Sequence, residues 1–211
     1  IAGVRDFTRS EFAVDEASAA LYAEATWRPT EKLTLTAGLR GDAYSFETRA
    51  RDGAAWNGKV EDEILLPKIG AAYELAEGVA IYANWGEGFH SNDARGVTSP
   101  TDPTPPLVKG RGQEIGARYE RHGIVATATY WEMKSDSELI YVGDSGSVEP
   151  SAPSERYGYE FTAFWRPRPG LAIDGVWTQS HARFVDSPGA EFIPGAIEQS
   201  GELGVTYIRE N

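Results

Sequence analysis

The 211-residue chain has no cysteine, only one methionine and only three histidines. The absence of cysteine excludes a disulfide framework and thiol chemistry. His90, His122 and His181 are far apart in the sequence and lack the spacing of metal ligands, so no metal site is predicted. No nucleophile elbow or nucleotide-binding loop is present either. We therefore expect neither an enzyme nor a cofactor-binding protein.

Positive charge is also scarce, and long apolar runs are missing. Lys and Arg number 20 against 32 Asp and Glu, which gives a net charge of -12 and a pI near 4.7. This balance argues against a nucleic-acid partner, because phosphate binding needs clustered cations. No run approaches the ~20 apolar residues of a membrane helix. The mean hydropathy of -0.41 would suggest a soluble protein, but membrane β-barrels escape that inference because only alternate residues face lipid.

Two-residue alternation of apolar and polar side chains is the main positive signal. It recurs in segments 19–27, 33–42, 69–75, 79–85, 115–120, 159–166, 171–180 and 202–207, with the apolar residues at odd positions. Successive side chains of a strand point to opposite faces, so this pattern predicts a sheet with one apolar and one polar face. The run from Ile124 to Lys134 is ambiguous, because both of its faces carry apolar residues.

The predicted connections alternate between short and long. The short ones, at 29–32, 76–78, 121–123 and 167–170, are rich in Pro and Gly and suit tight turns. The long ones are polar and run through about 48–62, 89–110, 143–154 and 185–194. The order predicts about nine antiparallel strands in an up-and-down meander, with short turns on one side and long loops on the other. This all-β layout is the one expected for part of a transmembrane β-barrel.

Aromatic residues at the strand ends favour the same interpretation. We expect Trp27, Tyr73, Trp85, Tyr159 and Trp165 to form girdles at the membrane interfaces. The even-numbered face would then line the lumen, with charged residues of both signs: Glu24, Arg28, Arg40, Asp42, Lys68, Glu74, Glu114, Arg118, Glu120, Glu160, Arg166, Asp174 and Glu202.

Several segments carry a family resemblance in order. Thr34–Asp42 followed by Tyr44 resembles the "LT-GLR-D-Y" strand of TonB-dependent outer-membrane receptors, and Leu66–Tyr73 resembles their "PK-G--Y" strand. Ile81–Phe89 is similar to the "YANYG-GF" strand that leads into a large extracellular loop. Further matches are Lys109–Gly116, Arg156–Phe161 and the "-IPG-" block at Phe192–Ala196. Together the blocks cover residues 19–209.

The resemblance implies a plugged barrel of about 22 strands, of which residues 1–211 would be a fragment without the plug domain and the terminal strands. It also implies a bacterial outer-membrane receptor for active uptake of a scarce ligand, such as a ferric siderophore or another metal chelate. The implied partners are outer-membrane lipid, the receptor's own plug domain and the TonB-ExbB-ExbD complex. Two alternatives stay open: a soluble carbohydrate-binding or carbohydrate-active β-protein, and a passive porin-like barrel.

Candidate ligand-binding residues lie where a predicted strand enters the longest loop. His90, Asn92, Asp93 and Arg95 form a polar cluster there, and Arg111 follows at the other end of the loop. Arginine pairs well with anionic chelates. We expect these residues on the extracellular side.

Overall fold

The computed structural model describes residues 10–142, 147–189 and 191–209. It contains eleven strands and one short helix within these ranges. The elements are β1 (Ser10–Trp27), β2 (Leu33–Gly53), β3 (Gly58–Ala76), β4 (Val79–Ser91), α1 (Ala94–Val97), β5 (Leu107–Arg121), β6 (Ile124–Ser135), β7 (Leu139–Val142), β8 (Ser147–Pro150), β9 (Ser154–Arg168), β10 (Leu171–Phe184) and β11 (Gln199–Tyr207). No helix among the described residues is long and apolar enough to cross a membrane.

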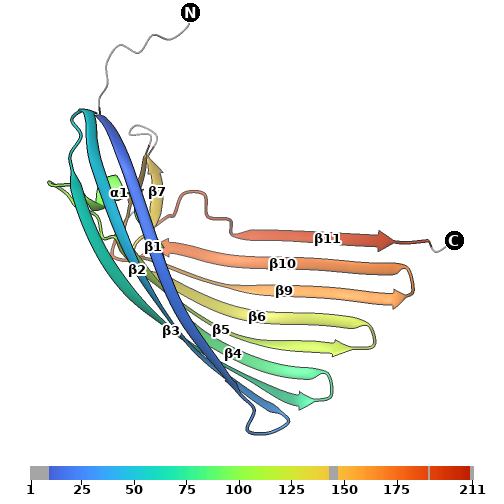
Figure 1. The fold of residues 1–211 in the computed structure, drawn as a ribbon. Coiled ribbons are helices and arrows are strands. Elements are labelled where there is room, and N and C mark those ends of the chain that lie inside the picture. Colours follow the sequence, from blue (N-terminus) through green and yellow to red (C-terminus); the bar gives the residue numbers. More distant parts are fainter. Residues whose placement is uncertain (1–9, 143–146, 190, 210–211) are drawn as a thin grey trace, which may run out of the picture.

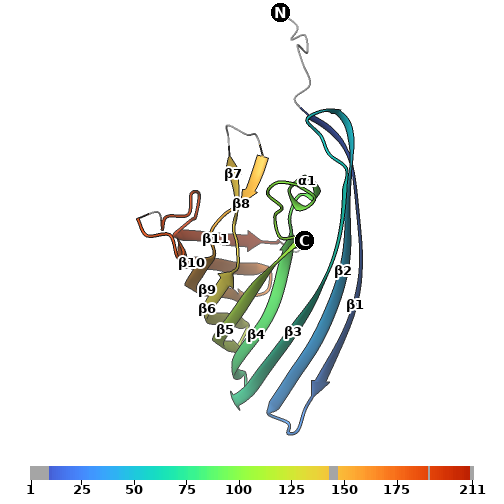
Figure 2. The same cartoon turned by 90° about the vertical axis from the view of Figure 1, so that its left-hand side faces the viewer.

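Nine of the strands form one curved antiparallel sheet (Figures 1 and 2). Its order is β1-β2-β3-β4-β5-β6-β9-β10-β11, so each strand pairs with the next strand of the sheet along the chain. The remaining two strands, β7 and β8, form a separate hairpin between β6 and β9. The predicted up-and-down meander of about nine strands is confirmed.

Short turns connect the strands along one edge of the sheet, as predicted (Figure 1). Gly78 and Gly170 have φ values of 74° and 76°, a left-handed conformation that glycine adopts without steric cost. Gly123 has the same conformation in a turn of only two residues, and His122 beside it also has a positive φ of 55°. Glycine therefore lets these strands reverse direction with almost no connecting chain.

One predicted long loop is wrong. The chain from 48 to 62 is mostly strand: β2 and β3 are paired out to Thr48 and Gly58, and only residues 54–57 connect them. Polar side chains on both faces hid this extension from the alternation pattern. The hairpin persists because the helix-bearing loop packs on one of its faces, where Phe46 and Thr48 are fully buried. Residues 143–146 of another predicted loop, 143–154, lie outside the described residues.

The ambiguous run is a central strand with a shifted phase. β6 pairs with β5 and β9, and its two-residue turn places Arg121 opposite Ile124, so odd positions of β5 face even positions of β6. The pairing of Ile124 with Trp165 restores the odd phase in β9. Even positions of β6 therefore share a face with odd positions of the other strands. The two-residue turns at 77–78 and 169–170 are each accompanied by a register shift that keeps the odd phase, and the turn at 122–123 is not. The side chains of β6 therefore change faces, because the strand period is two.

Candidate functional site

The curvature of the sheet distinguishes its two faces. Helix α1 lies on the concave side, between the long β1–β3 hairpins and the strands opposite (Figure 2). The helix contacts Phe46, and Thr98, the residue after the helix, bonds to Thr48. Phe46 and Thr48 are both at even positions of β2. The register carries this assignment across the sheet, so even positions face the concave side in every strand of the sheet except β6, where odd positions do. Near the long loop, odd positions of β4 and β5 also turn inward, toward the side chains of β2.

The convex face is apolar and exposed. Leu21, Ile69, Ile115, Leu203 and Val205 are between 58 % and 81 % exposed, although they sit in regular strands of a sheet. A water-soluble sheet would cover such a surface, since contiguous apolar patches of this size mark contact with another apolar phase. The five predicted girdle residues, Trp27, Tyr73, Trp85, Tyr159 and Trp165, all occupy convex positions.

Ion pairs end the apolar convex surface on the side of the long loops. Arg49 bonds to Asp15 on β1 and, at 2.7 Å, to Glu47 on its own strand. Arg183 of β10 donates to Glu155 of β9 at 2.7 Å. All of these residues hold convex positions. The apolar face is therefore a band with a charged border above it.

The concave face carries the charged residues that the sequence pattern predicted for a lumen. All thirteen predicted residues except Arg28, which follows β1, occupy concave positions in strands. Lys68 of β3 extends over Gly38 of β2 and pairs with Glu24 of β1 at 2.5 Å. A Cβ atom added at Gly38 would lie 2.7 Å from the Lys68 Cε, so a side chain there would displace Lys68 from this path.

The same device recurs with a neutral pair. Tyr82 of β4 extends over Gly116 of β5, and its hydroxyl bonds to the Thr129 hydroxyl of β6 at 2.6 Å. A Cβ atom at Gly116 would come within 2.5 Å of the Tyr82 ring. These two side chains tie β3 to β1 and β4 to β6 across the intervening strand.

The predicted ligand-binding cluster is divided in the structure. Asn92 holds the base of the loop, donating from Nδ2 to the Pro105 carbonyl at 2.8 Å. Asp93 caps α1 and forms a two-pronged pair with Arg95, at 2.9 and 2.6 Å. These bonds from the Arg95 guanidinium lower the pKa of the Asp93 carboxyl. Both charges are therefore already paired within the loop.

The other two residues of that prediction have different surroundings. Arg111 pairs with Glu87 of β4 at 3.0 Å, and Lys109 bonds to the same carboxylate at 2.7 Å. The imidazole Nε2 of His90 is buried and has no hydrogen-bond partner among the described residues, and the same holds for Oδ1 of Asn92. These two are the buried side-chain atoms of the predicted cluster that lack a hydrogen-bond partner among the described residues.

The upper part of β4 and β5 leaves the wall after Gly86, where the pairing of β4 with β3 ends. Phe89 then packs edge-on against the concave Tyr44, at 5.6 Å between ring centroids, and Leu107 packs on the cluster around Phe46. The predicted assignment of odd positions to the apolar outer face therefore fails here. Once the β4–β5 ribbon is separate from β3, it twists until its odd face meets the β2 side chains.

The loop itself has a small core that the sequence pattern did not reveal. Ala94 and Val97 of α1 bury Phe46, and the Thr98 hydroxyl bonds to Thr48 at 2.7 Å and accepts from the Trp56 indole at 3.1 Å. The signal that could have found this packing was Phe46, an aromatic residue in the otherwise polar phase of its strand.

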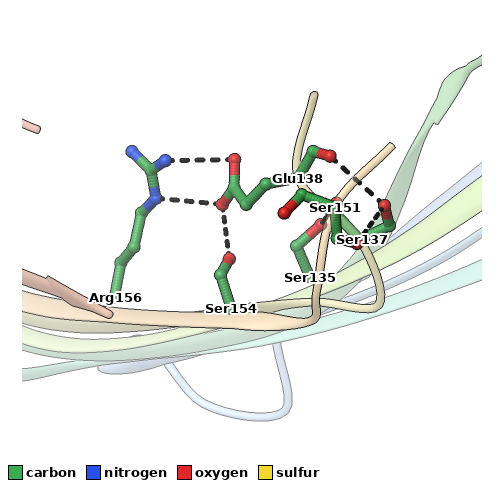
Figure 3. Close-up of polar contacts among 6 residues, drawn as sticks. All are labelled: Ser135, Ser137, Glu138, Ser151, Ser154 and Arg156. Atoms are coloured by element: carbon green, nitrogen blue, oxygen red, sulfur yellow. Dashed lines mark hydrogen bonds and ion pairs between the residues drawn. The ribbon is translucent and has the colours of Figure 1, made fainter. Parts of the chain in front are cut away.

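A polar cluster at the base of the β7–β8 hairpin was not predicted from the sequence either (Figure 3). Arg156 of β9 donates to Glu138 at 3.3 and 3.1 Å, and Ser154 bonds to the same carboxylate. The Ser137 hydroxyl donates to the Ser151 carbonyl at 2.8 Å. Arg156 holds a concave position, so this clasp ties the hairpin to the concave wall. Ser137 and Glu138 precede the hairpin in the sequence, and Ser151 and Arg156 follow it, so no local sequence motif reveals the cluster.

No three His, Asp or Glu side chains in the described ranges approach closely enough to hold a metal ion. The arrangement instead offers two surfaces: an apolar convex band and a polar concave wall with loops at one end. Such a division suits contact with lipid on one side and with polar molecules on the other.

Comparisons with known proteins agree with this division. Residues 3–211 match the family described as "TonB dependent receptor-like, beta-barrel". The chain belongs to this family, whose members are transport receptors of the outer membrane.

Individual relatives are distant, and all are larger. The pesticin receptor of Yersinia enterocolitica is 26% identical over 165 residues, which cover 74% of this chain and 24% of that protein. The structure of the ferric yersiniabactin uptake receptor FyuA from Yersinia pestis has a TM-score of 0.77 at 21% identity, covering 96% of this chain and 33% of that one. The ferric-catecholate import receptor Fiu from E. coli K12 has a TM-score of 0.77 at 18% identity, covering 93% and 32%. The chain thus spans about a quarter of the length of the curated relatives it matches.

Proposed function

We propose that this chain is part of the barrel wall of an outer-membrane receptor that imports a ferric siderophore or a similar metal chelate. The observation that carries the proposal is the two-faced sheet of a receptor-family member: exposed apolar residues on the convex side and paired charges on the concave side. In this proposal residues 1–211 are a partial barrel domain, the convex face contacts outer-membrane lipid, and the twelve concave charged residues face the lumen together with Arg28.

The height of the apolar band supports a membrane location. On β3 the convex residues from Leu65 to Leu75 are all apolar, and the next convex residue toward the long loop is Glu63. Ten residue steps at about 3.3 Å span about 33 Å along the strand. A strand tilt of about 40° reduces this to about 25 Å, the height of the apolar band on barrels of this kind.

The sheet edges support a larger barrel. β1 and β11 end the sheet, and each presents an unpaired strand edge among the described residues. Exposed edges of this length invite aggregation, and barrel closure removes them. We propose that further strands of the full-length protein pair with both edges and that a plug domain contacts the concave wall.

The names of the relatives favour an iron chelate as cargo. Two of the structurally similar proteins are receptors for ferric yersiniabactin and ferric catecholate. Transport through a plugged barrel would draw energy from the TonB-ExbB-ExbD complex of the inner membrane. Family membership favours this function over a soluble carbohydrate-binding protein.

Uptake by cells that carry the full-length gene tests the proposal. We expect radioactive iron from at least one member of a panel of ferric chelates to accumulate in the parent strain, and accumulation to be lost on deletion of either the gene or tonB. Membrane fractionation should recover the protein with the outer membrane. Uptake that depends on the gene but survives tonB deletion would instead establish the passive porin-like alternative.

A further inference from the structure

The concave wall has two kinds of glycine. Gly38 and Gly116 are crossed by side chains of this chain. Gly88 differs: a Cβ atom there would meet no described atom within 4 Å, and at Gly110 and Gly112 the nearest would be carbonyl oxygens at 3.5 and 3.9 Å. The φ values of these three residues lie outside the left-handed region that favours glycine. Neither backbone conformation nor the packing of the described residues requires glycine at these positions.

These glycines form the floor of a recess. Gly86 pairs with Gly112 and Gly88 pairs with Gly110, so four concave positions on β4 and β5 lack side chains. Glycine in the interior of a strand weakens it and often marks a place where a ligand or another backbone approaches closely. The cost is about 0.5–1 kcal/mol per residue relative to alanine. A Cβ atom at Gly86 would lie 3.2 Å from the Lys68 Cβ, so packing accounts for that glycine, whereas the three open glycines, Gly88, Gly110 and Gly112, indicate that the bare surface is used.

The borders of the recess turn away from its floor. On one side Lys68 extends over Gly38 toward β1. On the other side Trp131 lies against Gly158 of β9, where a Cβ atom would come within 3.0 Å of the indole. The floor is therefore left open between them, in a hollow of about 600 Å³. Small-molecule sites have volumes of about 300–1,000 Å³.

The chemistry of the borders selects a ligand class. Trp131 and Met133 provide an aromatic and a polarizable surface, which suit contact with another aromatic ring. Asn84 and Glu114, bonded to each other at 2.7 Å, close the lower end with a carboxylate that can accept a hydrogen bond from a hydroxyl group. The peptide planes of the floor are flat. Together these features favour a planar ring that carries a hydroxyl group.

We propose that this glycine-floored recess binds a phenolic ring of the metal chelate. The inference rests on the proposed function and adds to it the ligand class and the contact surface. The ring lies on the peptide planes of Gly88 and Gly112, with Met133 at its edge and a phenolic hydroxyl toward Glu114.

Substitutions in the full-length receptor test the recess. The probe is the ferric complex of a catechol chelator, and its binding is measured on purified outer membranes. We expect Gly88→Val to weaken binding about tenfold or more, because the added methyl groups occupy the floor. Gly41→Val is the matched control, since Gly41 is an open glycine on the convex face, 3.8 Å from Leu65. It should bind the probe as the parent does.

Two further variants distinguish a ligand site from a surface that another part of the receptor covers. Met133→Glu adds a charge at the border without touching the backbone and should also weaken binding. A thiol introduced by Met133→Cys should react with a maleimide in the free receptor and be protected by the probe. A thiol already protected without the probe would show that a polypeptide segment covers the recess, and would overturn the proposal.

The remaining outcomes separate the site from the proposed function. Unchanged binding by Gly88→Val and Met133→Glu overturns the site. If the parent receptor imports other ferric chelates in a TonB-dependent way but fails to bind the catechol complex, the proposed function stands and the phenolic site is refuted. Outer-membrane levels of each variant are measured in parallel, and Met133→Glu decides the question if Gly88→Val fails to assemble.

Discussion

Replacing Ile69 by arginine would place a charge in the middle of the convex apolar band. Ile69 lies on β3 between Leu65 and Leu75, and its side chain is 58 % exposed in the sheet. If the convex face contacts lipid, this exposed surface lies in hydrocarbon. If the protein is soluble, the same surface faces water. The two cases predict opposite effects of the substitution.

The expected loss of stability has two contributions, the cost of placing arginine in lipid and the loss of the isoleucine side chain from lipid. Arginine at the midplane of a membrane barrel costs about 2–4 kcal/mol. Full burial of an isoleucine side chain contributes about 1.5–3 kcal/mol, so the exposed 58 % of Ile69 contributes about 1–2 kcal/mol when lipid covers it. We therefore expect Ile69→Arg to lower the free energy of unfolding by about 3–6 kcal/mol in lipid.

The assay is reversible unfolding of the full-length protein in phospholipid vesicles with guanidinium chloride. Ala72→Arg serves as the control, because Ala72 lies three residues further along β3 on the concave face, where Glu74 of the same strand can pair with the new charge. We expect a change of less than about 1 kcal/mol for this variant, the usual range for a charge in a polar setting. Equal costs for both variants, or a larger cost for Ala72→Arg, would refute the assignment of the convex face to lipid.

Three other predictions concern the concave wall and its loop. Gly116→Ala should lower stability by about 1–3 kcal/mol through overpacking against Tyr82, measured by the same unfolding assay. Thr98→Val should leave the partner hydroxyl in β2 buried and unpaired, cost about 1–3 kcal/mol locally and speed proteolytic cleavage of loop 92–106. Because bonds from Arg95 lower the pKa of Asp93, their stabilisation of the loop is complete above the ordinary carboxyl pKa of about 3.9 and is lost as the pH falls through the lowered value. Protection of the loop from an acid-active protease should therefore be constant down to about pH 4 and decline below it.

Matched variants define the outcomes that would contradict these predictions. A Cβ atom at Gly110 would have its nearest contact at 3.5 Å, so Gly110→Ala should leave stability nearly unchanged. If it lowers stability as much as Gly116→Ala does, the loss in Gly116→Ala does not come from the Tyr82 side chain that crosses Gly116. Thr104→Val, which removes a hydroxyl without a partner among the described residues, should not increase cleavage. Asp93→Asn should abolish the acid-dependent loss of protection. A pH profile that does not change in this variant would assign the dependence to another group.

The fold could be predicted to a large extent because it depends on a local rule. Residues such as Leu21, Ile69 and Leu203 occupy the odd positions of their strands, and the period of two assigns them all to one face without knowledge of the neighbours. The short turns were predictable for the same reason, since Gly78 and Gly170 identify left-handed turn positions within a few residues of sequence. The family resemblance of ordered motifs adds the barrel.

The candidate site was less predictable, because pairing partners are not local. His90, Asn92, Asp93, Arg95 and Arg111 are close in sequence or join the same loop, but Asp93 pairs with Arg95 while Arg111 pairs with Glu87. The clasp of Arg156 with Glu138 depends on the hairpin between them, and the recess depends on register that pairs Gly86 with Gly112. Neither is visible in a single strand.

By itself, the sequence determines the strands, their two faces and the family, since alternation, turn glycines and ordered motifs are properties of neighbouring residues. Only the tertiary structure decides the phase of β6, the extension of β2 and β3, and the twist that moves Phe89 onto Tyr44. The physical reason is that register and twist are set by contacts between strands. A register shift beside a turn, or its absence, and the end of one pairing decide which face a side chain occupies, and the sequence of that strand alone does not specify them.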